Sequence, residues 1–426
     1  MSCESVALNA EISAEDIAKL CFDKFKSLPK TGKPNEKEWT ILAGVVLHHK
    51  QTGKSEVISL GSGTKCIGKS KLCPQGLILN DSHAEVMARR GLMRYMYHQL
   101  KNALVKSDEN TESIFEWLPE QKKFQMKKDL TFHFLSTQTP CGDACIIAKP
   151  KPQDCNEEEP LIKRSKLEEV KFDETNTGCI VDNVYTGAKL IGSHHSDAMQ
   201  QLVGAVRTKP GRGERTLSLS CSDKLAKWQV MGVQGALLDF LLMAPIYFET
   251  LNFWGDNDFV SLERAIWKRF ENNDFQPNKY KLHIPEIRIC KKPAFPYAQD
   301  SAKQPSPNSL VWCNIPEMLK PYEISVNGKK QGITTKKLHS PQSALKISKF
   351  YLLKEFINVL KMLPVLCNTF DKLESKSYSE CKSWAKDYQN AWSAVKVNYF
   401  RQWSHKPDNL LHFSVEEIEN KDNGKK

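Results

Sequence analysis

The sequence predicts an α/β protein in which helices pack on the faces of a mixed β-sheet. The chain has 426 residues, of which 40% are apolar, so it is long enough to bury a sizeable core. Its first third reads strand, strand, helix, strand, helix. That order is typical of a sheet that combines a hairpin with strands linked through helices.

The first two strands are β-rich runs joined by the turn KQTGK, which favours a hairpin. The tight turn TPCGDA at the end of the next strand leads into a second helix. In chain order, the expected elements are a short helix over 13–27 in an N-terminal region of helix and linker (1–38), strands over 39–49 and 55–67, a helix over 82–102, a strand over 129–138 and a short helix that begins near 142.

The middle of the chain contains a charged, Pro-containing segment, 148–176, which we expect to be a disordered insertion. A domain over 39–407 should surround it. The remaining expected elements are a helix over 196–206, a basic glycine loop over 207–216, the strand LSLSC over 217–221, a core helix that runs into a strand over 235–248, a helical half with Pro-rich loops after about 255, and a tail over 408–426.

Charge and cysteine content restrict the partner and the compartment. Lys and Arg (61) outnumber Asp and Glu (50), which favours a polyanionic partner. The 13 cysteines form no dense disulfide framework, and the N-terminus has no apolar signal region, so we expect an intracellular protein of the nucleus, the cytoplasm or both. The longest apolar run is too short to span a membrane, and no obligate protein partner is evident.

Two short segments suggest a catalytic site. His83-Ala-Glu85 begins an amphipathic helix, and Pro140-Cys141-Gly142-Asp143 follows a strand about 55 residues later. Helix N-termini behind both segments would stabilise thiolate and hydroxide charge. H-x-E followed at a distance by P-C-x-x-C is the pattern of the zinc-dependent nucleobase deaminases. The alternative is that Glu85 is an ordinary acidic residue in a first helical turn.

The third zinc ligand is open on spacing alone, because this chain has C-x-x-x-C after Pro140. The candidates are Cys145, one helical turn beyond Cys141, and the distant Cys221 in LSLSCSDKLAKW. Spacing favours Cys145 slightly.

The motifs GTKCIG, LNDSHAEVMARRG, LSTQTPCGDA, SCSDKLAKW and GVQGALL occur in this order. From about residue 40 to near 407, the chain resembles the catalytic domain of the adenosine deaminases acting on RNA and their tRNA-specific relatives. The resemblance implies a cytidine-deaminase-like α/β/α sandwich extended by a C-terminal helical half. It also implies Zn²⁺ held by His83, Cys141 and Cys221, with Cys145 as an ordinary neighbour. Glu85 would transfer protons from water to the adenine ring and to the leaving amine.

Members of this family bury 1D-myo-inositol hexakisphosphate in the domain core. A polyanion of that charge density is buried only where many cations surround it. Two family lysines are missing here, where Ile347 and Trp392 stand, although Lys346 and Lys349 are neighbours that could substitute. The matching residues are Arg89, Arg90, Lys224, Lys227, Trp228, Lys382, Tyr388, Gln389, Trp403 and Lys406.

The tRNA-specific branch, which deaminates adenosine 37 of tRNA-Ala, is the more similar. Only about 40 residues precede the core here, and the 207–216 loop is short and basic where duplex editors carry a base-flipping glutamate. We expect the anticodon loop as substrate, Thr64 and Lys65 near the target nucleotide, and the 207–216 loop on the RNA backbone. The alternatives are an editor of messenger or duplex RNA, a nucleoside deaminase, and a catalytically silent RNA-binding protein with a structural zinc. The basic composition argues against free nucleosides, and an intact Glu85 argues against the silent protein.

Overall fold

The structure, a computed structural model, describes residues 11–105, 113–150, 179–184, 188–190, 203–211, 214–271, 279–318, 320–367 and 370–424. Eight of its strands form one central sheet: β2 (Leu42–His49), β3 (Ser55–Ser62), β8 (Leu130–Ser136), β13 (Phe248–Trp254), β14 (Glu286–Cys290), β16 (Asn308–Cys313), β17 (Tyr322–Val326) and β18 (Lys329–Lys330).

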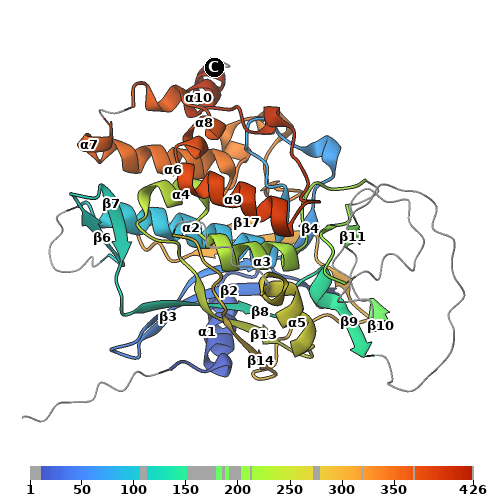
Figure 1. The fold of residues 1–426 in the computed structure, drawn as a ribbon. Helices are drawn as coiled ribbons and strands as arrows, with labels where there is room; N and C mark the ends of the chain where they lie inside the picture. The colour runs from blue at the N-terminus through green and yellow to red at the C-terminus, as the bar shows by residue number, and fades with distance from the viewer. Residues whose placement is uncertain are drawn as a thin grey trace, which may run out of the picture.

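The strand order is β14-β13-β8-β2-β3-β16-β17-β18 (Figure 1). Strands β14, β13 and β8 run parallel, and each later neighbour pairs antiparallel. This confirms the predicted mixed sheet. β2 and β3 form the predicted hairpin.

The central strand β2 contributes to a core on each face of the sheet. Ala43, Val45 and Leu47 belong to one buried cluster, and Leu42 and Val46 to the other. This follows from the two-residue period of a strand. Because both faces are covered, β2 is apolar almost throughout, as expected for the middle of a covered sheet.

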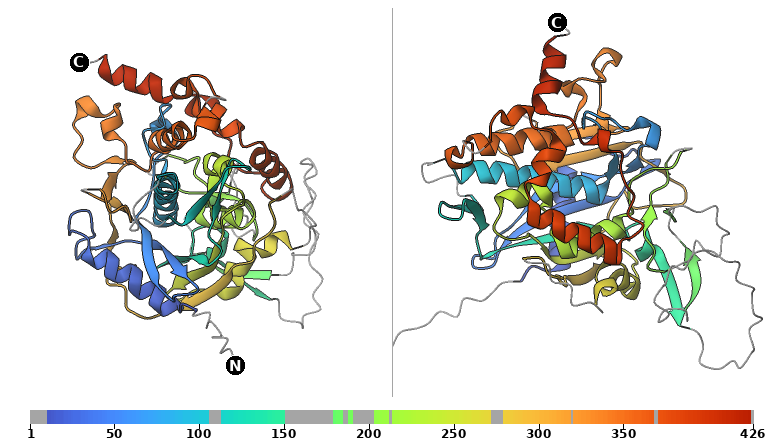
Figure 2. Two further views of the ribbon diagram at one scale, coloured as in Figure 1. Left: turned by 90° about the vertical axis from the view of Figure 1, so that its left-hand side faces the viewer. Right: turned by 45° about the horizontal axis from the view of Figure 1, so that its top comes forward.

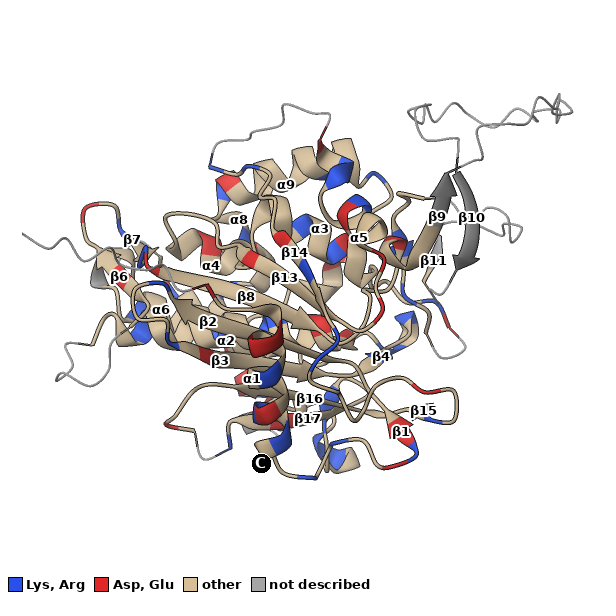
Figure 3. Cartoon of the chain, turned by 90° about the horizontal axis from the view of Figure 1, so that it is seen from below, with Lys and Arg blue, Asp and Glu red and all other residues tan. Residues whose placement is uncertain are grey.

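Helix α1 (Ala14–Ser27) covers one face of the sheet and confirms the helix predicted over 13–27. Ile17, Cys21 and Phe25 lie one turn apart and are buried in the core cluster of that face. The charged residues of α1, coloured in Figure 3, include Lys19 and Asp23, which form an ion pair at the surface. The amphipathic pattern therefore attaches α1 to the sheet through one stripe.

The other face carries α2 (Ala84–Asn102), α3 (Cys221–Met231), α4 (Gly235–Leu241) and α5 (Phe259–Ile266). Helix α2 lies very close to β3 because Gly61 has no side chain. A Cβ atom on Gly61 would lie 2.4 Å from the amide nitrogen of Ala88 and 2.5 Å from the carbonyl oxygen of Ala84. This contact fixes the first turn of α2, where the His83 motif stands.

Beyond α2 lies a further helical layer, drawn in orange and red in Figures 1 and 2. It confirms the predicted helical extension, although it begins only at Lys349. Its helices are α6 (Lys349–Lys361), α7 (Pro364–Cys367), α8 (Tyr378–Ser383), α9 (Lys386–Tyr399) and α10 (Val415–Asn423).

Two predictions for the second half of the chain are wrong. Residues 286–330, expected to be helices and loops, contain four strands of the central sheet, and these strands are short and separated by Pro-containing loops. Residues 408–423, expected to be a tail, form the 3-10 helix η9 (Asp408–Leu410) and α10. Phe413, Val415 and Ile418 are buried there, so this segment belongs to the core.

Three predictions near residues 140–221 also differ from the structure. The helix expected near 142 is only a 3-10 turn, η2 (Asp143–Cys145), because Gly142 has a φ of +110°. The strand β9 (Ile146–Pro150) follows and pairs with β10 (Cys179–Val184), so the expected insertion begins after a strand. LSLSC forms no strand, since Leu219 makes a single bridge to Thr208. Residues 151–178 and most of the helix predicted over 196–206 lie outside the described residues.

The remaining strands form small pairs, and short 3-10 helices connect several elements. The strand pairs are β1 (Glu38–Trp39) with β15 (Gln304–Pro305), β4 (Thr64–Cys66) with β5 (Asp81–His83), β6 (Phe115–Leu118) with β7 (Lys123–Met126), and β11 (Lys189–Leu190) with β12 (Arg207–Thr208). The 3-10 helices are η1 (Lys69–Lys71), η5 (Lys268–Phe270), η6 (Thr335–Lys337), η7 (Pro341–Ser343) and η8 (Leu373–Ser375). Within the described ranges, no helix has both the length and the apolar character to cross a membrane.

Candidate active site

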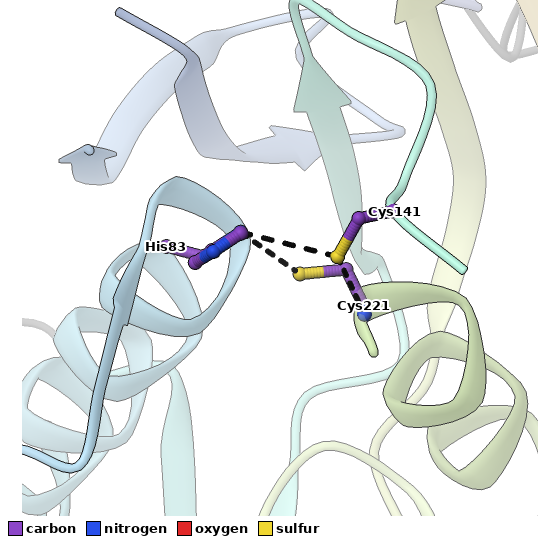
Figure 4. A group of neighbouring side chains, drawn as sticks. All are labelled: His83, Cys141 and Cys221. Atoms are coloured by element: carbon purple, nitrogen blue, oxygen red, sulfur yellow. Dashed lines mark hydrogen bonds between the residues drawn. The ribbon is translucent and has the colours of Figure 1, made fainter. Parts of the chain in front are cut away.

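Three side chains predicted as zinc ligands meet beside the ends of α2 and α3 (Figure 4). His83 is the last residue of β5 and the N-cap of α2, Cys141 lies in the turn after β8, and Cys221 is the first residue of α3. The Nδ1 atom of His83 lies 4.0 Å from the Sγ of Cys141 and 3.9 Å from the Sγ of Cys221. Two thiols and one imidazole are therefore gathered from distant parts of the chain.

The spacing of these donors fits a tetrahedral zinc ion. Zinc lies about 2.0–2.1 Å from histidine nitrogen and about 2.3 Å from cysteine sulfur, which places the two donor atoms roughly 3.6 Å apart. The N–S distances here are slightly longer. Burial and Lys209 act to lower the pKa of His83, but the thiols of Cys66 and Cys141 raise it to about 10. The neighbouring thiols therefore favour positive charge beside them.

Two helix N-termini point at this group, but one of them is not the predicted one. Cys141 precedes only the 3-10 turn η2, whereas Cys221 begins α3, whose N-cap Ser220 accepts a hydrogen bond from the amide of Asp223. Partial positive charge at the starts of α2 and α3 stabilises thiolate there. The prediction was thus right about two helix dipoles and wrong about which cysteine starts the second helix.

Ser222 attaches the Cys141 turn to the start of α3. Its amide donates to the carbonyl of Cys141 over 3.0 Å, and its hydroxyl donates to the carbonyl of Pro140 over 2.9 Å. The amide of Cys221 points at the Sγ of Cys141, 3.3 Å away. The interaction of the Cys141 thiol with Cys221, together with the charges of Lys209 and His83, holds the pKa of Cys141 well below its usual range despite burial.

The structure does not bring Cys145 into the group. Its Sγ lies 3.3 Å from the carbonyl oxygen of Pro140 and 3.8 Å from that of Thr139, and burial raises the pKa of its thiol. Of the two candidates that spacing left open, only Cys221 lies beside His83 and Cys141.

A second set of possible metal donors, Cys66, Asp81 and His83, shares the histidine. The carboxylate of Asp81 is already paired with the ammonium groups of Lys209 and Lys224. Although burial acts in the opposite direction, these two cations hold the pKa of Asp81 well below its usual range. Asp81 is therefore neutralised by lysines, and the set with two cysteines is the better metal site.

Glu85 and Thr64 supply polar atoms beside the group. Glu85 is 1% exposed, and its Oε2 has no hydrogen-bond partner among the described residues. Thr64 lies directly opposite His83 in the β4–β5 pair, and its Oγ1 is likewise buried and without such a partner. Lys65 is the next residue on β4 and is partly buried. Buried polar atoms without partners are expected where a substrate binds.

A cavity of about 210 Å³ reaches Asp81, two residues before His83 in the chain. Lys382 and Gln389, which were predicted to bind the polyanion, do not line this cavity. The side-chain amide nitrogen (Nε2) of Gln389 donates to the carbonyl oxygen of Lys382. The other predicted polyanion ligands do line the cavity, and Lys349 lines it as well. These predicted ligands are Arg89, Arg90, Lys224, Lys227, Trp228, Tyr388, Trp403 and Lys406.

The cations of this cavity lack enough anionic partners. Burial and the charges of Lys382, Arg89 and Lys406 hold the pKa of Lys227 well below its usual range. Burial, with Lys224 as the next cause, lowers the pKa of Lys406 to about 8. In addition, Nη2 of Arg90 is buried without a hydrogen-bond partner among the described residues. The residues therefore fit a densely charged polyanion.

The two positions that departed from the family pattern now have structural roles. Ile347 is buried, and its carbonyl accepts a hydrogen bond from Nε of Arg90 over 2.6 Å. Lys349, at the start of α6, lines the cavity, whereas Lys346 lies over the ring of Tyr351. Trp392 presents its ring 3.5 Å from the Nζ of Lys227, so its π-face stabilises that ammonium.

Sequence reasoning missed a line of charged residues between the cavity and the metal donors. Lys209 is 1% exposed, and its Nζ contacts the Oδ2 of Asp81 and the Sγ of Cys221, both at 2.9 Å. Asp81 also contacts Lys224, which lines the cavity. The alternation of a strand could have indicated Asp81, since residues 81 and 83 share a side. No local pattern distinguishes Lys209 from a surface lysine.

The 207–216 loop, which was predicted to touch the RNA backbone, is buried in part and described in part. Arg207 and Lys209 are buried, and Arg212 lies outside the described residues. Glu214 accepts hydrogen bonds from the amide and hydroxyl of Ser70, which ties the loop to η1. Arg215 is exposed.

A basic groove of about 790 Å³ continues from this loop. We name it the lysine groove; Lys71, Lys329, Lys330 and His339 lie along it. The turn before β18 docks close to the site, because the amide of Leu79 donates to the carbonyl of Gly328 over 2.9 Å. Ile78 lines both the lysine groove and the basic cavity, so the two are neighbours.

Comparison with known proteins adds to this geometry. The family model described as adenosine-deaminase (editase) domain matches residues 59–407. The tRNA-specific adenosine deaminase 1 of Drosophila melanogaster is 50% identical over 411 residues, which cover 95% of this chain and 98% of the relative. Its namesake from Homo sapiens is 32% identical, with 94% and 99% covered. The double-stranded RNA-specific adenosine deaminase of Mus musculus is 27% identical, with 96% of this chain but only 33% of the relative covered.

Proposed function

This chain belongs to the adenosine-deaminase (editase) family and is an adenosine deaminase that acts on tRNA; we propose that it converts adenosine 37 of tRNA-Ala to inosine with a zinc ion held by His83, Cys141 and Cys221. One observation carries the assignment of the site. The only described group that joins a histidine to two cysteines lies beside a buried carboxylate, Glu85, with an unpartnered oxygen.

The reaction adds water at C6 of adenine and releases ammonia. Zinc bound by three protein ligands supplies a water molecule whose pKa is lowered toward about 7. Glu85 would take a proton from that water and give it to the ring nitrogen next to C6, while the remaining hydroxide adds to C6. Glu85 would then take the second proton, from the hydroxyl now bound to C6, and give it to the amino group, so that the C–N bond breaks, ammonia leaves and the C6 carbonyl of inosine forms. Burial of Glu85 keeps bulk water from competing for these protons.

Inositol hexakisphosphate is the proposed occupant of the basic cavity. Cations at close range in a partly buried cavity repel one another, and an uncompensated buried charge costs several kcal/mol. The lowered pKa values of Lys227, Lys349 and Lys406 support a missing anion. Through Lys224, Asp81 and Lys209, such a ligand would also stabilise the residues next to Cys221.

The proposed substrate is the anticodon loop of tRNA-Ala. A base in a duplex must unstack before C6 reaches a buried site, and a loop base requires less energy to extract. Thr64 and Lys65 would contact the target nucleotide, because β4 lies directly against His83. The lysine groove would hold phosphates of the adjoining stem, since its cations gain from counterion release.

Incubation of the purified protein with total tRNA tests this function. Inosine is read as guanosine in sequencing, so A-to-G changes map the modified positions. The proposal predicts a change at position 37 of tRNA-Ala. Conversion elsewhere in tRNA, with position 37 of tRNA-Ala unmodified, would overturn the assignment of the target.

A further inference from the structure

The two cysteines of the metal group occur in similar short sequences, Cys141-Gly142-Asp143 and Cys221-Ser222-Asp223. In both, an aspartate follows the cysteine by two residues. Both aspartates are fully buried, with 0% exposure. The two carboxylates take no part in the proposed reaction.

One guanidinium joins the two carboxylates. Arg269, on η5, places Nη1 3.0 Å from Oδ1 of Asp223 and Nη2 3.8 Å from Oδ2 of Asp143. Its side chain is 9% exposed, and its guanidinium lies 5.5 Å from the ring centroid of the fully buried Phe400. The arginine therefore reaches the two carboxylates from a third part of the chain, with a hydrogen bond to Asp223 and a longer ion pair to Asp143. Its Nε and Nη2 have no hydrogen-bond partner among the described residues.

Other contacts, most of them with distant segments, also hold each aspartate. Asp143 accepts from the amide of Gly204 over 2.6 Å and pairs with Arg264. Asp223 accepts from the hydroxyl of Ser220 over 2.6 Å and from the amide of Arg207 over 3.0 Å. The guanidinium of Arg207 adds positive charge near both carboxylates. Arg269 forms an ion pair with each of the two aspartates.

We propose that Arg269 is a positioning residue that sets the separation of Cys141 and Cys221 for the metal ion. This rests on the zinc centre of the proposed function. The Cys141 turn is followed by the short 3-10 turn η2 rather than by an α-helix, so its position depends on contacts with other segments. A planar guanidinium that pairs with both aspartates fixes the relative position of the loops in advance, as partners of metal ligands commonly do.

A merely structural ion pair would behave differently. Its loss would lower the stability of the metal-free and metal-loaded protein equally, and the metal's surroundings would not change. A positioning role requires weaker metal binding in a protein that is still folded. It also requires a change in ligand geometry around the metal.

Arg269→Gln and Arg269→Lys are the test variants, with Lys268→Gln as the matched control. Lys268 lies on the same turn, is 41% exposed and pairs with Glu263. Zinc affinity is measured by competition with a chromophoric chelator. Cobalt(II) replaces zinc for absorption spectra, and melting is recorded with and without metal.

We expect Arg269→Gln to weaken zinc binding about 10- to 100-fold and to alter the cobalt spectrum. Arg269→Lys, which keeps the charge but loses the planar fork, should fold and show a smaller change of the same kind. Lys268→Gln should match the unaltered protein. Unchanged zinc affinity and cobalt spectrum in a folded Arg269 variant would overturn the proposal. If the unaltered protein binds no zinc, the proposed function fails instead.

Discussion

The Nζ of Lys209 lies 2.9 Å from the Sγ of Cys221, inside the protein. Burial alone would lower the pKa of this lysine, but Asp81 and the thiols of Cys221 and Cys141 raise it well above its usual range. Lys209 therefore remains charged and offsets the negative charge of one metal donor. Through Asp81 and Lys224, it also connects that donor to the basic cavity.

Lys209→Met is expected to destabilise the protein and weaken zinc binding. Removal of one partner from a buried charge group costs about 3–5 kcal/mol, because the remaining charge is uncompensated. Chemical unfolding and metal analysis measure both effects. Lys26→Met, on the exposed side of α1, is the control. Normal stability and metal content in Lys209→Met would contradict the role assigned to this lysine.

Metal analysis of cysteine variants checks the ligand set. Cys221→Ala and Cys141→Ala should each lose zinc, because only one thiol and His83 would remain. Cys145→Ala should keep zinc and most activity, since its thiol faces backbone carbonyls. Loss of zinc from Cys145→Ala, with zinc retained in Cys221→Ala, would reverse the assignment.

Binding of inositol hexakisphosphate should take up protons above about pH 8. Without the polyanion, the pKa of Lys406 is about 8, below its ordinary 10.5, so the unfolded chain binds more protons between these values. The stability of the ligand-free protein therefore rises with pH in this window. The polyanion reverses the shift, and its affinity falls as pH increases past about 8.

Calorimetry at pH 8.5 in two buffers of different ionisation enthalpy measures this proton uptake. Lys406→Met should reduce it, while Lys386→Met, at the exposed start of α9, should not. A binding enthalpy that is the same in both buffers would contradict the prediction.

Lys329→Ala combined with Lys330→Ala should weaken tRNA binding without changing the modified base. If each lysine neutralises one phosphate, a plot of the logarithm of the binding constant against the logarithm of the salt concentration should have a slope less steep by about two. Affinity measured from 50 to 200 mM salt tests this. Lys361→Ala, which removes a surface pair with Glu374, is the control. An unchanged slope in the double variant would exclude the lysine groove from the interface.

The sequence predicted the sheet class, α1, the first hairpin and α2, because their apolar periods are regular. It did not predict β14, β16 and β17, which are short. β14 and β16 pair with the more distant strands β13 and β3, and β17 pairs with β16 and so joins the sheet through it. The helix expected after Cys141 does not form, because Gly142 has a positive φ.

For the site, motif and resemblance together pointed to His83, Cys141, Cys221 and Glu85 as one group, and the structure brings these residues close together. Lys209 and Arg269 could not be found in this way. Their roles depend on burial next to carboxylates from other segments, and nothing in their own neighbourhoods indicates that burial. Lys349 was recognised only as one of two substitutes, and the cavity distinguishes it from Lys346.

A time course of inosine formation in intact tRNA-Ala carrying adenosine 37, with a long perfect RNA duplex as the competing substrate, tests the central claim most directly. The unaltered protein is predicted to convert position 37 and leave the duplex nearly unmodified. Glu85→Gln should bind zinc and tRNA normally and convert neither, because its amide cannot transfer the proton. Efficient deamination of the duplex with tRNA-Ala left unmodified, or normal turnover by Glu85→Gln, would contradict the account.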